Sequence, residues 1–288
     1  VWIIVGASIV TLLVAAVIAG VVYFLDLTKD YQYVDISKDP EVLGVPSDID
    51  FPEGITNIAL FGIDSRSDNF KGLSDSIMVI SINADTGSIK LVSVMRDSLV
   101  KVDGHGYQKI NAAYSKGGAE LAVKTLNQTF KLNIMEYATV DFVGMANIVD
   151  AVGGIEAELT KAEVHNANGQ IDEMATKRGT PRDYIKAPGK QTLSGIQAVA
   201  FSRVRYAATI NGTRDDYGRT ERQRLVMNQL FQKALSMEFS QYPDLIRALL
   251  PCVQTSLSYD EILDLAKVLT LDHISMQQGR IPADNTII

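Results

Sequence analysis

Three short apolar runs decide the fold: NIALFGI at 57–63, SIMVISI at 76–82 and IKLVSVM at 89–95. Short apolar runs bounded by turn residues are typical of buried strands. The stretch NADTGS at 83–88 has turn composition, and Gly87 is able to take a positive φ there. Short connections of this kind allow antiparallel pairing. The sequence therefore predicts a three-stranded antiparallel meander.

Strands and helices are interspersed along the rest of the chain. A further strand is expected at 134–143, and the polar residues 165–186 are expected to be irregular. Predicted helices cover 118–130, 145–151, 194–203, 220–237, 242–250 and 258–269. The last of these opens with the capping-box pattern Ser258–Glu261. This alternation indicates an α/β fold with a mixed central sheet.

The first 25 residues carry no charged side chain and are rich in Val, Ile, Leu and Ala. A helix of this length spans roughly 37 Å, against about 30 Å for the hydrocarbon core of a bilayer. Trp2 and Tyr23 lie near its ends, where aromatic rings favour the membrane interface. A cleaved signal peptide is the alternative, although its apolar region usually runs only about 7–15 residues. We predict one transmembrane helix at 1–25.

The residues after this helix are mainly acidic rather than a positive cluster, which fits a single-pass protein of the cell membrane whose domain faces the outside. Residues 26–55 contain three prolines among polar residues, which predicts a stalk that wraps onto the domain. Residues 56–288 suffice for one large domain. We expect its core at 56–240 and a helical C-terminal part at 241–288.

Composition excludes several classes of function. The net charge of −7 argues against generic nucleic-acid binding. Cys252 is the lone cysteine, so no internal disulfide forms. With only three scattered histidines, the chain also lacks the residues for a His/Cys zinc site.

Two carboxylates and an arginine fall at one end of the predicted meander. Asp64, Asp75 and Arg96 follow or precede its strands there, together with Arg66 and Asp97. Paired carboxylates suit Mg²⁺, which commonly binds one or two of them plus substrate phosphates. Arginines beside them suit phosphate oxygens because the guanidinium binds in a bidentate manner. The alternative is a set of ordinary turn aspartates and strand-end salt bridges.

A second basic group lies in FSRVRYAATINGTRDDYGRTERQR at 201–224. Arg203 and Arg205 share a face only if the backbone there is extended, so we expect the preceding helix to end at about Arg203. Arg219, Arg222 and Gln223 are spaced to share one helix face. The alternative, a solvated helix with acidic counter-ions, explains Arg224 better than it explains the whole set.

Two further stretches are weaker candidates. Lys109 precedes a Gly-Gly pair at 117–118 near a helix start, where anions bind favourably. The apolar residues 142–152 are a candidate wall for a lipid channel, although stripes of this kind are more often plain core.

Taken together, the chain resembles the LytR-CpsA-Psr family over roughly 55–240. The matching pieces occur in order: GIDSR at 62–66, SDS at 74–76, RDS at 96–98, KINAAY with GG at 109–118, VDFVGMANIVDAVGG at 140–154, LSGIQAVAFSRVR at 193–205 and DYGRTERQR at 216–224. Seven pieces in order are highly specific.

The resemblance implies an extracytoplasmic αβα-type domain whose apolar pocket holds a polyprenyl chain, with its pyrophosphate at the mouth. It also implies a phosphotransferase that moves an anionic glycopolymer, of teichoic acid or capsule type, from an undecaprenyl-pyrophosphate carrier to peptidoglycan. Two departures stand out. Leu73 occupies a position where many relatives have Arg, and the stretch between Arg205 and Asp216 is longer than expected.

By motif, the resemblance assigns roles to nine side chains. Asp64 and Asp75 match metal-binding carboxylates for Mg²⁺, with Mn²⁺ as the alternative. The residues that match pyrophosphate contacts are Arg96, Arg203, Arg205, Arg219 and Gln223, with Arg66 and Lys109 as less secure matches. Of these, Asp75, Arg96, Arg203 and Arg205 are the expected catalytic set. Asp75 and Asp97 remain alternative general bases.

Other functions use the same residues. A polyprenyl-pyrophosphate hydrolase would take water as its acceptor, and a non-catalytic lipid-phosphate binder or surface regulator would need no acceptor at all. No nucleotide-sugar signature supports a glycosyltransferase.

Overall fold

The computed structural model describes residues 31–64, 70, 72–238, 241–266, 268, 271 and 273–283. The strands are β1 (Gln32–Tyr33), β2 (Ile55–Ile63), β3 (Ser74–Asn83), β4 (Ser88–Val94), β5 (Leu99–Val102), β6 (Gly106–Lys109), β7 (Glu136–Asp141), β8 (Ile155–Leu159), β9 (Gly189–Leu193), β10 (Val253–Thr255) and β11 (Ser275–Ile281). The helices are α2 (Ala112–Phe130), α3 (Phe142–Ala151), α4 (Lys161–Arg178), α5 (Gly195–Ser202), α6 (Asp215–Ser236), α7 (Tyr242–Leu249) and α8 (Tyr259–Ala266), with a 3-10 turn at Leu250–Cys252.

Within these residues, seven strands form a mixed sheet in the order β1-β10-β7-β2-β3-β4-β11. The three apolar runs form β2, β3 and β4, and both of their pairings are antiparallel, as the sequence predicts. The pairs β2–β7 and β4–β11 are parallel. A bulge between Gly62 and Ile63 interrupts the β2–β3 ladder where the hairpin reaches Asp64 and Asp75.

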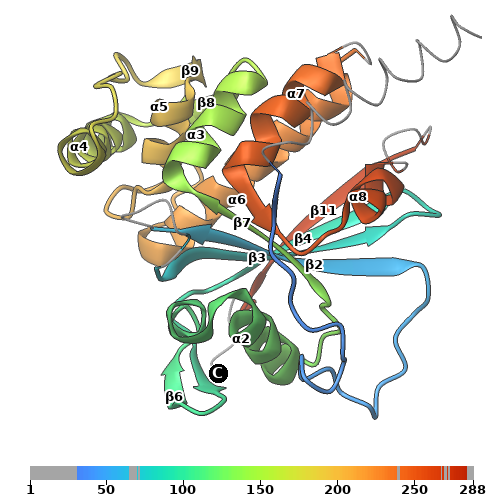
Figure 1. Cartoon of the computed structure of the whole chain (residues 1–288). Helices are drawn as coiled ribbons and strands as arrows, with labels where there is room; N and C mark the ends of the chain where they lie inside the picture. The colour runs from blue at the N-terminus through green and yellow to red at the C-terminus, as the bar shows by residue number, and fades with distance from the viewer. Residues whose placement is uncertain are drawn as a thin grey trace, which may run out of the picture.

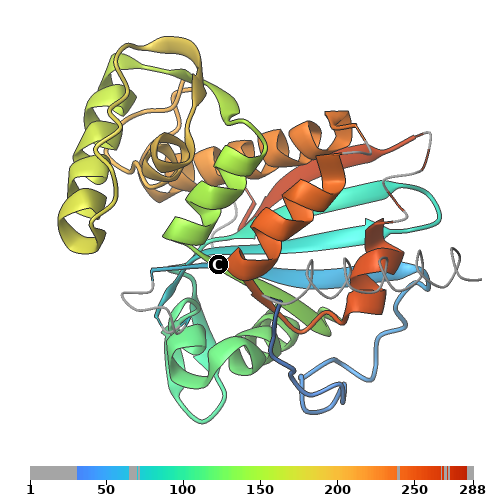
Figure 2. The same ribbon diagram turned by 45° about the horizontal axis from the view of Figure 1, so that its top comes forward.

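Helices cover both faces of the sheet (Figures 1 and 2). On one face, α2 packs Val123 and Leu126 against a core that contains Phe61. On the other face lie α3, α6 and α7. A second core joins α3 to α4 and α5 through residues such as Val149, Ile171 and Phe201. The domain is therefore an α/β fold with a mixed sheet between helices, as predicted.

The ends of the described chain close the two edges of the sheet. At one edge β1 pairs with β10, and nearby Leu43 is fully buried and accepts a 2.9 Å hydrogen bond from the Asn127 side chain. At the other edge β11 pairs with β4. Helices α7 and α8 lie where helices are predicted after residue 240, but the prediction of a helical C-terminal part missed both β10 and β11.

Helix α4 corrects the expectation of irregular structure at 165–186. Thr160 and Glu163 form a complete capping box at its start, and Gly179 ends it with a positive φ of 70°. The Ser258–Glu261 capping contacts of α8 form as predicted, with Glu261 N–H donating to Ser258 Oγ at 3.3 Å.

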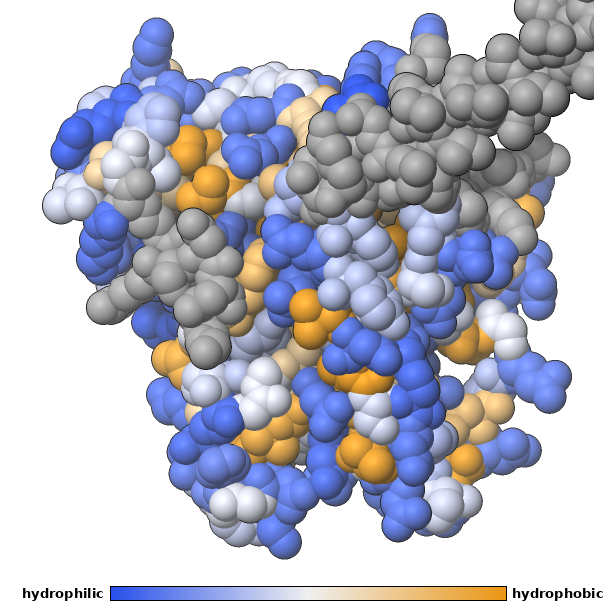
Figure 3. Space-filling view, viewed as in Figure 1, coloured by the Kyte–Doolittle hydropathy of each residue, from blue (hydrophilic) through white to orange (hydrophobic). Residues whose placement is uncertain are grey.

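The predicted transmembrane helix at 1–25 lies outside the described residues. Among the helices that the structure does describe, none combines the length and the apolar composition needed to cross a bilayer. On the face seen in Figure 3, apolar side chains gather in small patches that hydrophilic residues separate.

Candidate functional site

A cavity of about 560 Å³ lies between one face of the sheet and helices α3, α6 and α7. Its apolar walls come from the sheet and from helices α3, α6 and α7. These wall residues include Leu60, Met78, Phe142, Met145, Ile148, Val152, Val226, Leu230, Leu245 and Leu249. Four of them belong to 142–152, so that stretch lines a cavity rather than only a solid core.

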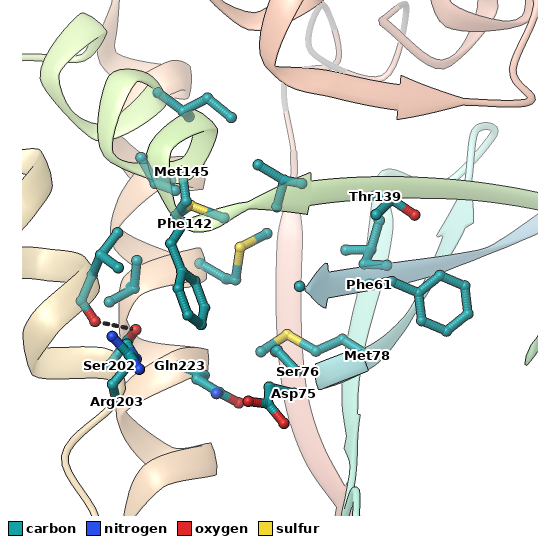
Figure 4. A pocket seen from close by; sticks show the side chains of 18 of the residues that line it. Phe61, Asp75, Ser76, Met78, Thr139, Phe142, Met145, Ser202, Arg203 and Gln223 are labelled. Carbon is teal, nitrogen blue, oxygen red and sulfur yellow. Dashed lines mark hydrogen bonds between the residues drawn. The ribbon is translucent and has the colours of Figure 1, made fainter. Parts of the chain in front are cut away.

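Charged and polar side chains gather at one end of this cavity. They are Asp75, Arg96, Arg203, Arg205, Arg219 and Gln223, all among its lining residues. In Figure 4 the side chains of Asp75 from β3 and Gln223 from α6 point toward each other across the space. Residues that lie far apart in the sequence thus form one group of four guanidinium ions, one carboxylate and one amide.

The antiparallel register explains how the first part of this group forms. Arg96 comes just after β4 and Asp75 lies near the start of β3, so both fall at the same end of the sheet. The Arg96 guanidinium donates a short hydrogen bond to the Asp75 carboxylate. This pair confirms that the ends of the predicted meander meet.

The end of helix α5 positions the next two arginines. Helix α5 ends at Ser202, and Arg203 is its C-cap, as the sequence predicts. The Arg203 guanidinium lies 4.6 Å from the centroid of the Phe142 ring and 3.5 Å from the Glu173 carboxylate of α4. Both contacts fix its side chain at the boundary between the apolar wall and the polar end.

Asp216, which the sequence offers only as a counter-ion in the alternative of a solvated helix, holds three of the arginines together. Its Oδ1 atom lies 2.7 Å from Arg219, 3.6 Å from Arg205 and 3.8 Å from Arg96. It is absent from the cavity lining, so it acts from behind the arginines. Its position in the first turn of α6, three residues before Arg219, is the signal that would have indicated this contact.

The Nε atoms of Arg96, Arg205 and Arg219 are buried without a hydrogen-bond partner. Burial lowers the pKa of Arg219 to about 10, against the opposing effect of the nearby Asp216. Arg219 therefore stays charged at neutral pH. A buried positive group short of acceptors is suited to an anionic ligand.

Arg222 does not join this group, although its spacing predicts a face shared with Arg219. Its side chain is 1% exposed and forms a 2.8 Å ion pair with Glu163, which is equally buried. Its remaining donors reach the carbonyl oxygens of Val204 at 3.0 Å and Ala207 at 2.7 Å. Arg222 thus fixes the backbone on both sides of Arg205.

The other predicted residues lie at different places. Lys109 is 63% exposed, does not line the cavity, and forms a 2.7 Å ion pair with Asp97. Partial burial raises the pKa of Asp97, but the hydrogen bond from Lys109 and the charge of Arg96 outweigh this and lower it overall. Arg66 lies outside the described residues.

Asp64 directly follows β2, and its backbone N–H donates to the Leu73 carbonyl at 3.4 Å. It therefore lies across the hairpin from the start of β3, near Asp75. No cluster of three or more His, Cys, Asp or Glu forms within the described ranges. Asp75 lines the cavity, whereas Asp64 is not among the lining residues.

Comparison with known proteins agrees with this geometry. A sequence model of the LytR_cpsA_psr family matches residues 27–288. The polyisoprenyl-teichoic acid–peptidoglycan teichoic acid transferase TagU of Bacillus mycoides is 32% identical over 259 residues, which cover 89% of this chain and 78% of the relative. TagU of Enterococcus faecalis is 33% identical over 266 residues, covering 90% and 79%.

Among solved structures, the LytR-CPS2A-psr family protein TagT with bound octaprenyl pyrophosphate lipid has a TM-score of 0.60. It is 20% identical, and the match covers 86% of this chain and 85% of TagT. At that identity the likeness speaks for the fold alone. The family match spans nearly all of the chain, and the chain therefore belongs to the LytR_cpsA_psr family.

Proposed function

We propose that this protein is a phosphotransferase that moves a teichoic acid-type glycopolymer from a polyprenyl-pyrophosphate carrier to peptidoglycan. One observation carries the proposal: a single cavity has long apolar walls and a cluster of four arginines at one end. A polyprenyl pyrophosphate has the same division, with an apolar chain and an anionic head group. The names of the TagU relatives describe this reaction.

The apolar walls account for the affinity for the lipid chain. Burial of apolar surface contributes roughly 25 cal/mol per Å², and the walls offer side chains from β2, β3, α3, α6 and α7. The arginines account for the head group, because charge-assisted and bidentate hydrogen bonds suit phosphate oxygens. Phe142, which contacts Arg203, marks the place where chain and head group join.

In the proposed reaction, an acceptor hydroxyl of peptidoglycan attacks the phosphorus atom that carries the polymer. The new P–O bond forms as the bond to the polyprenyl phosphate breaks, and the hydroxyl proton is released. Phosphoryl transfer of this kind depends mainly on positioning and on neutralisation of charge. Arg96, Arg203 and Arg219 would hold the phosphate oxygens as negative charge moves to the leaving group.

We further propose that Asp64 and Asp75 hold Mg²⁺, with Mn²⁺ as the alternative. When bound, such an ion neutralises charge on the two phosphates and on the leaving polyprenyl phosphate. The support is the hairpin that brings the two carboxylates to one end of the sheet beside the arginines. Of the two candidate bases, Asp75 accepts a hydrogen bond from Arg96 and lines the cavity, whereas Asp97 does not line it, is engaged by Lys109 and has a lowered pKa.

The test is transfer of labelled lipid-linked polymer onto a peptidoglycan oligomer with Mg²⁺ present, with lipid binding measured in parallel. We expect transfer by the unmutated protein and its loss on chelation. Release of the polymer phosphate into water, with none on the acceptor, would indicate the pyrophosphate hydrolase instead. Lipid binding without any turnover would indicate a regulatory binder.

We also propose that the domain faces the outside of the cell membrane, anchored by residues 1–25. The charge-free run supports this, together with the acidic residues that follow it. Protease added to intact, wall-stripped cells should digest the domain. Full protection in such cells, with digestion after lysis, would place the domain in the cytoplasm.

A further inference from the structure

We propose that Tyr206, with Gln170, forms a binding subsite for a pyranose ring at the polar end of the cavity. The inference rests on the proposed function in one respect, since it takes the ligand there to be a glycan. Both residues line the cavity, Tyr206 just after α5 and Gln170 on α4. Neither carries a charge, and neither belongs to the residues that match pyrophosphate contacts.

The exposure of Tyr206 is unusual for a large aromatic side chain, because its ring is 82% exposed. It therefore contributes little to the core. The Arg205 guanidinium lies 5.9 Å from the ring centroid, so the aromatic ring stands directly beside the phosphate-binding group. Aromatic faces carry partial negative charge and attract the C–H groups that cover one face of a pyranose ring.

The backbone beneath this exposed ring is held firmly. The buried Arg222 donates to the carbonyl oxygens of Val204 and Ala207, one on each side of the Arg205–Tyr206 pair. Beyond them, a turn closes where the Thr209 N–H donates to the Thr213 carbonyl at 2.8 Å. A platform fixed in advance loses little conformational entropy when a ligand binds.

The cavity lining also offers an uncharged amide. Asp75, Arg96 and Arg219 supply charged groups to the same lining. On the α4 side, Gln170 lies one turn from Glu173, which pairs with Arg203. The Gln170 amide makes no hydrogen bond to another described residue, and amides of this kind suit sugar hydroxyls. An aromatic platform and an available amide in the lining of one cavity are the composition of a carbohydrate site.

Two sugars would reach this position in the proposed reaction: the acceptor sugar of peptidoglycan and the first sugar of the donor polymer. Kinetics with Tyr206→Ala separate them. We expect KM to rise about tenfold, the effect of losing about 1.4 kcal/mol. A raised KM for the acceptor assigns the subsite to the acceptor sugar, and a raised KM for the donor assigns it to the donor sugar. Binding of sugar-free octaprenyl pyrophosphate should stay within twofold.

Two variants serve as controls. Tyr206→Phe keeps the ring and should behave as the unmutated protein. Tyr107→Ala removes an equally exposed tyrosine, 72% exposed on β6 and outside the cavity lining, and should change neither KM. Unchanged KM values for Tyr206→Ala, or an equal loss of octaprenyl pyrophosphate binding, would overturn the subsite.

Direct titration keeps the test separate from the proposed function. If the unmutated protein transfers nothing, binding of a peptidoglycan oligomer and of the polymer's saccharide is measured without turnover. Loss of either on Tyr206→Ala supports the subsite although the transferase proposal fails. Equal binding by both proteins overturns the subsite.

Discussion

Replacing Arg222 with methionine tests whether the fold of α6 depends on a buried ion pair. Arg222 and Glu163 are each 1% exposed and lie 2.8 Å apart. Methionine fills much of the same volume but leaves the Glu163 carboxylate without its ion-pair partner. Breaking such a pair by removing one partner costs about 3–5 kcal/mol. At about 2–4 °C per kcal/mol for a domain of this size, Tm should fall by roughly 6–20 °C.

Calorimetry of four variants, namely Arg222→Met, Glu163→Gln, their double variant and Arg219→Met, checks this estimate. Arg219→Met, one turn away on α6, is the matched control, because Asp216 keeps its contacts to Arg205 and Arg96. Arg219→Met should lose lipid binding, and its Tm should fall much less than that of Arg222→Met. The double variant with Glu163→Gln should be more stable than the sum of the single changes by about 0.5–3 kcal/mol. Two results would refute the role given to the pair. One is additive losses of stability in the double variant. The other is a Tm of Arg222→Met within 2 °C of the unmutated protein, which corresponds to a loss of about 1 kcal/mol or less.

Three further variants test the site and the fold. Asp75→Ala should abolish transfer and leave lipid-chain binding intact, since apolar walls hold the chain; normal turnover by this variant would leave catalysis to the arginines. Arg203→Ala should weaken lipid binding and transfer together by about 1.5–3 kcal/mol, measured by titration and kinetics; an effect on only one of them contradicts its head-group role. Burial raises the pKa of Glu136 above its ordinary 4.5, despite hydrogen bonds from Lys38 and Ser256. The folded state therefore holds this proton more tightly, and stability should fall as pH rises from about 4.5 through the raised pKa. Glu136→Gln should flatten that fall in urea titrations, and an unchanged slope would contradict the assignment.

Periodicity and motif spacing predict the part of the fold that carries the arginines. The apolar runs at 57–63, 76–82 and 89–95 are local signals, and their short connections fix the pairing. The end of α5 at Ser202 is predicted by the two-residue spacing of Arg203 and Arg205, which does not place them on one face of a helix. The tertiary contacts of α6 are different. Arg219 and Arg222 look alike in the sequence, and only the position of Glu163 on α4 separates their roles.

Helix α4 and strand β11 were missed for physical reasons. Asn166, Asn168 and Gly169 are poor helix formers, and they obscure the spacing of Val164 and Ile171. The Thr160–Glu163 capping box was the available signal. Strand β11 reads SMQQGRI and has little apolar alternation, because it is an edge strand with much of its surface exposed. Its pairing with β4 is a long-range contact that no local pattern reveals.

The late position of β10 and β11 in the sequence has a consequence for how the chain folds. Strand β4 gains its second neighbour, β11, only when residues 275–281 are present. Strand β7 likewise gains β10 only when residues 253–255 are present. Pairings so distant in sequence are slow to form, because the chain loses loop-closure entropy before the new contacts stabilise it. The sheet is thus incomplete until nearly all of the described chain has been synthesised. We expect C-terminal truncations at residue 270 to leave β4 as an open edge prone to aggregation, with the arginine cluster left unassembled.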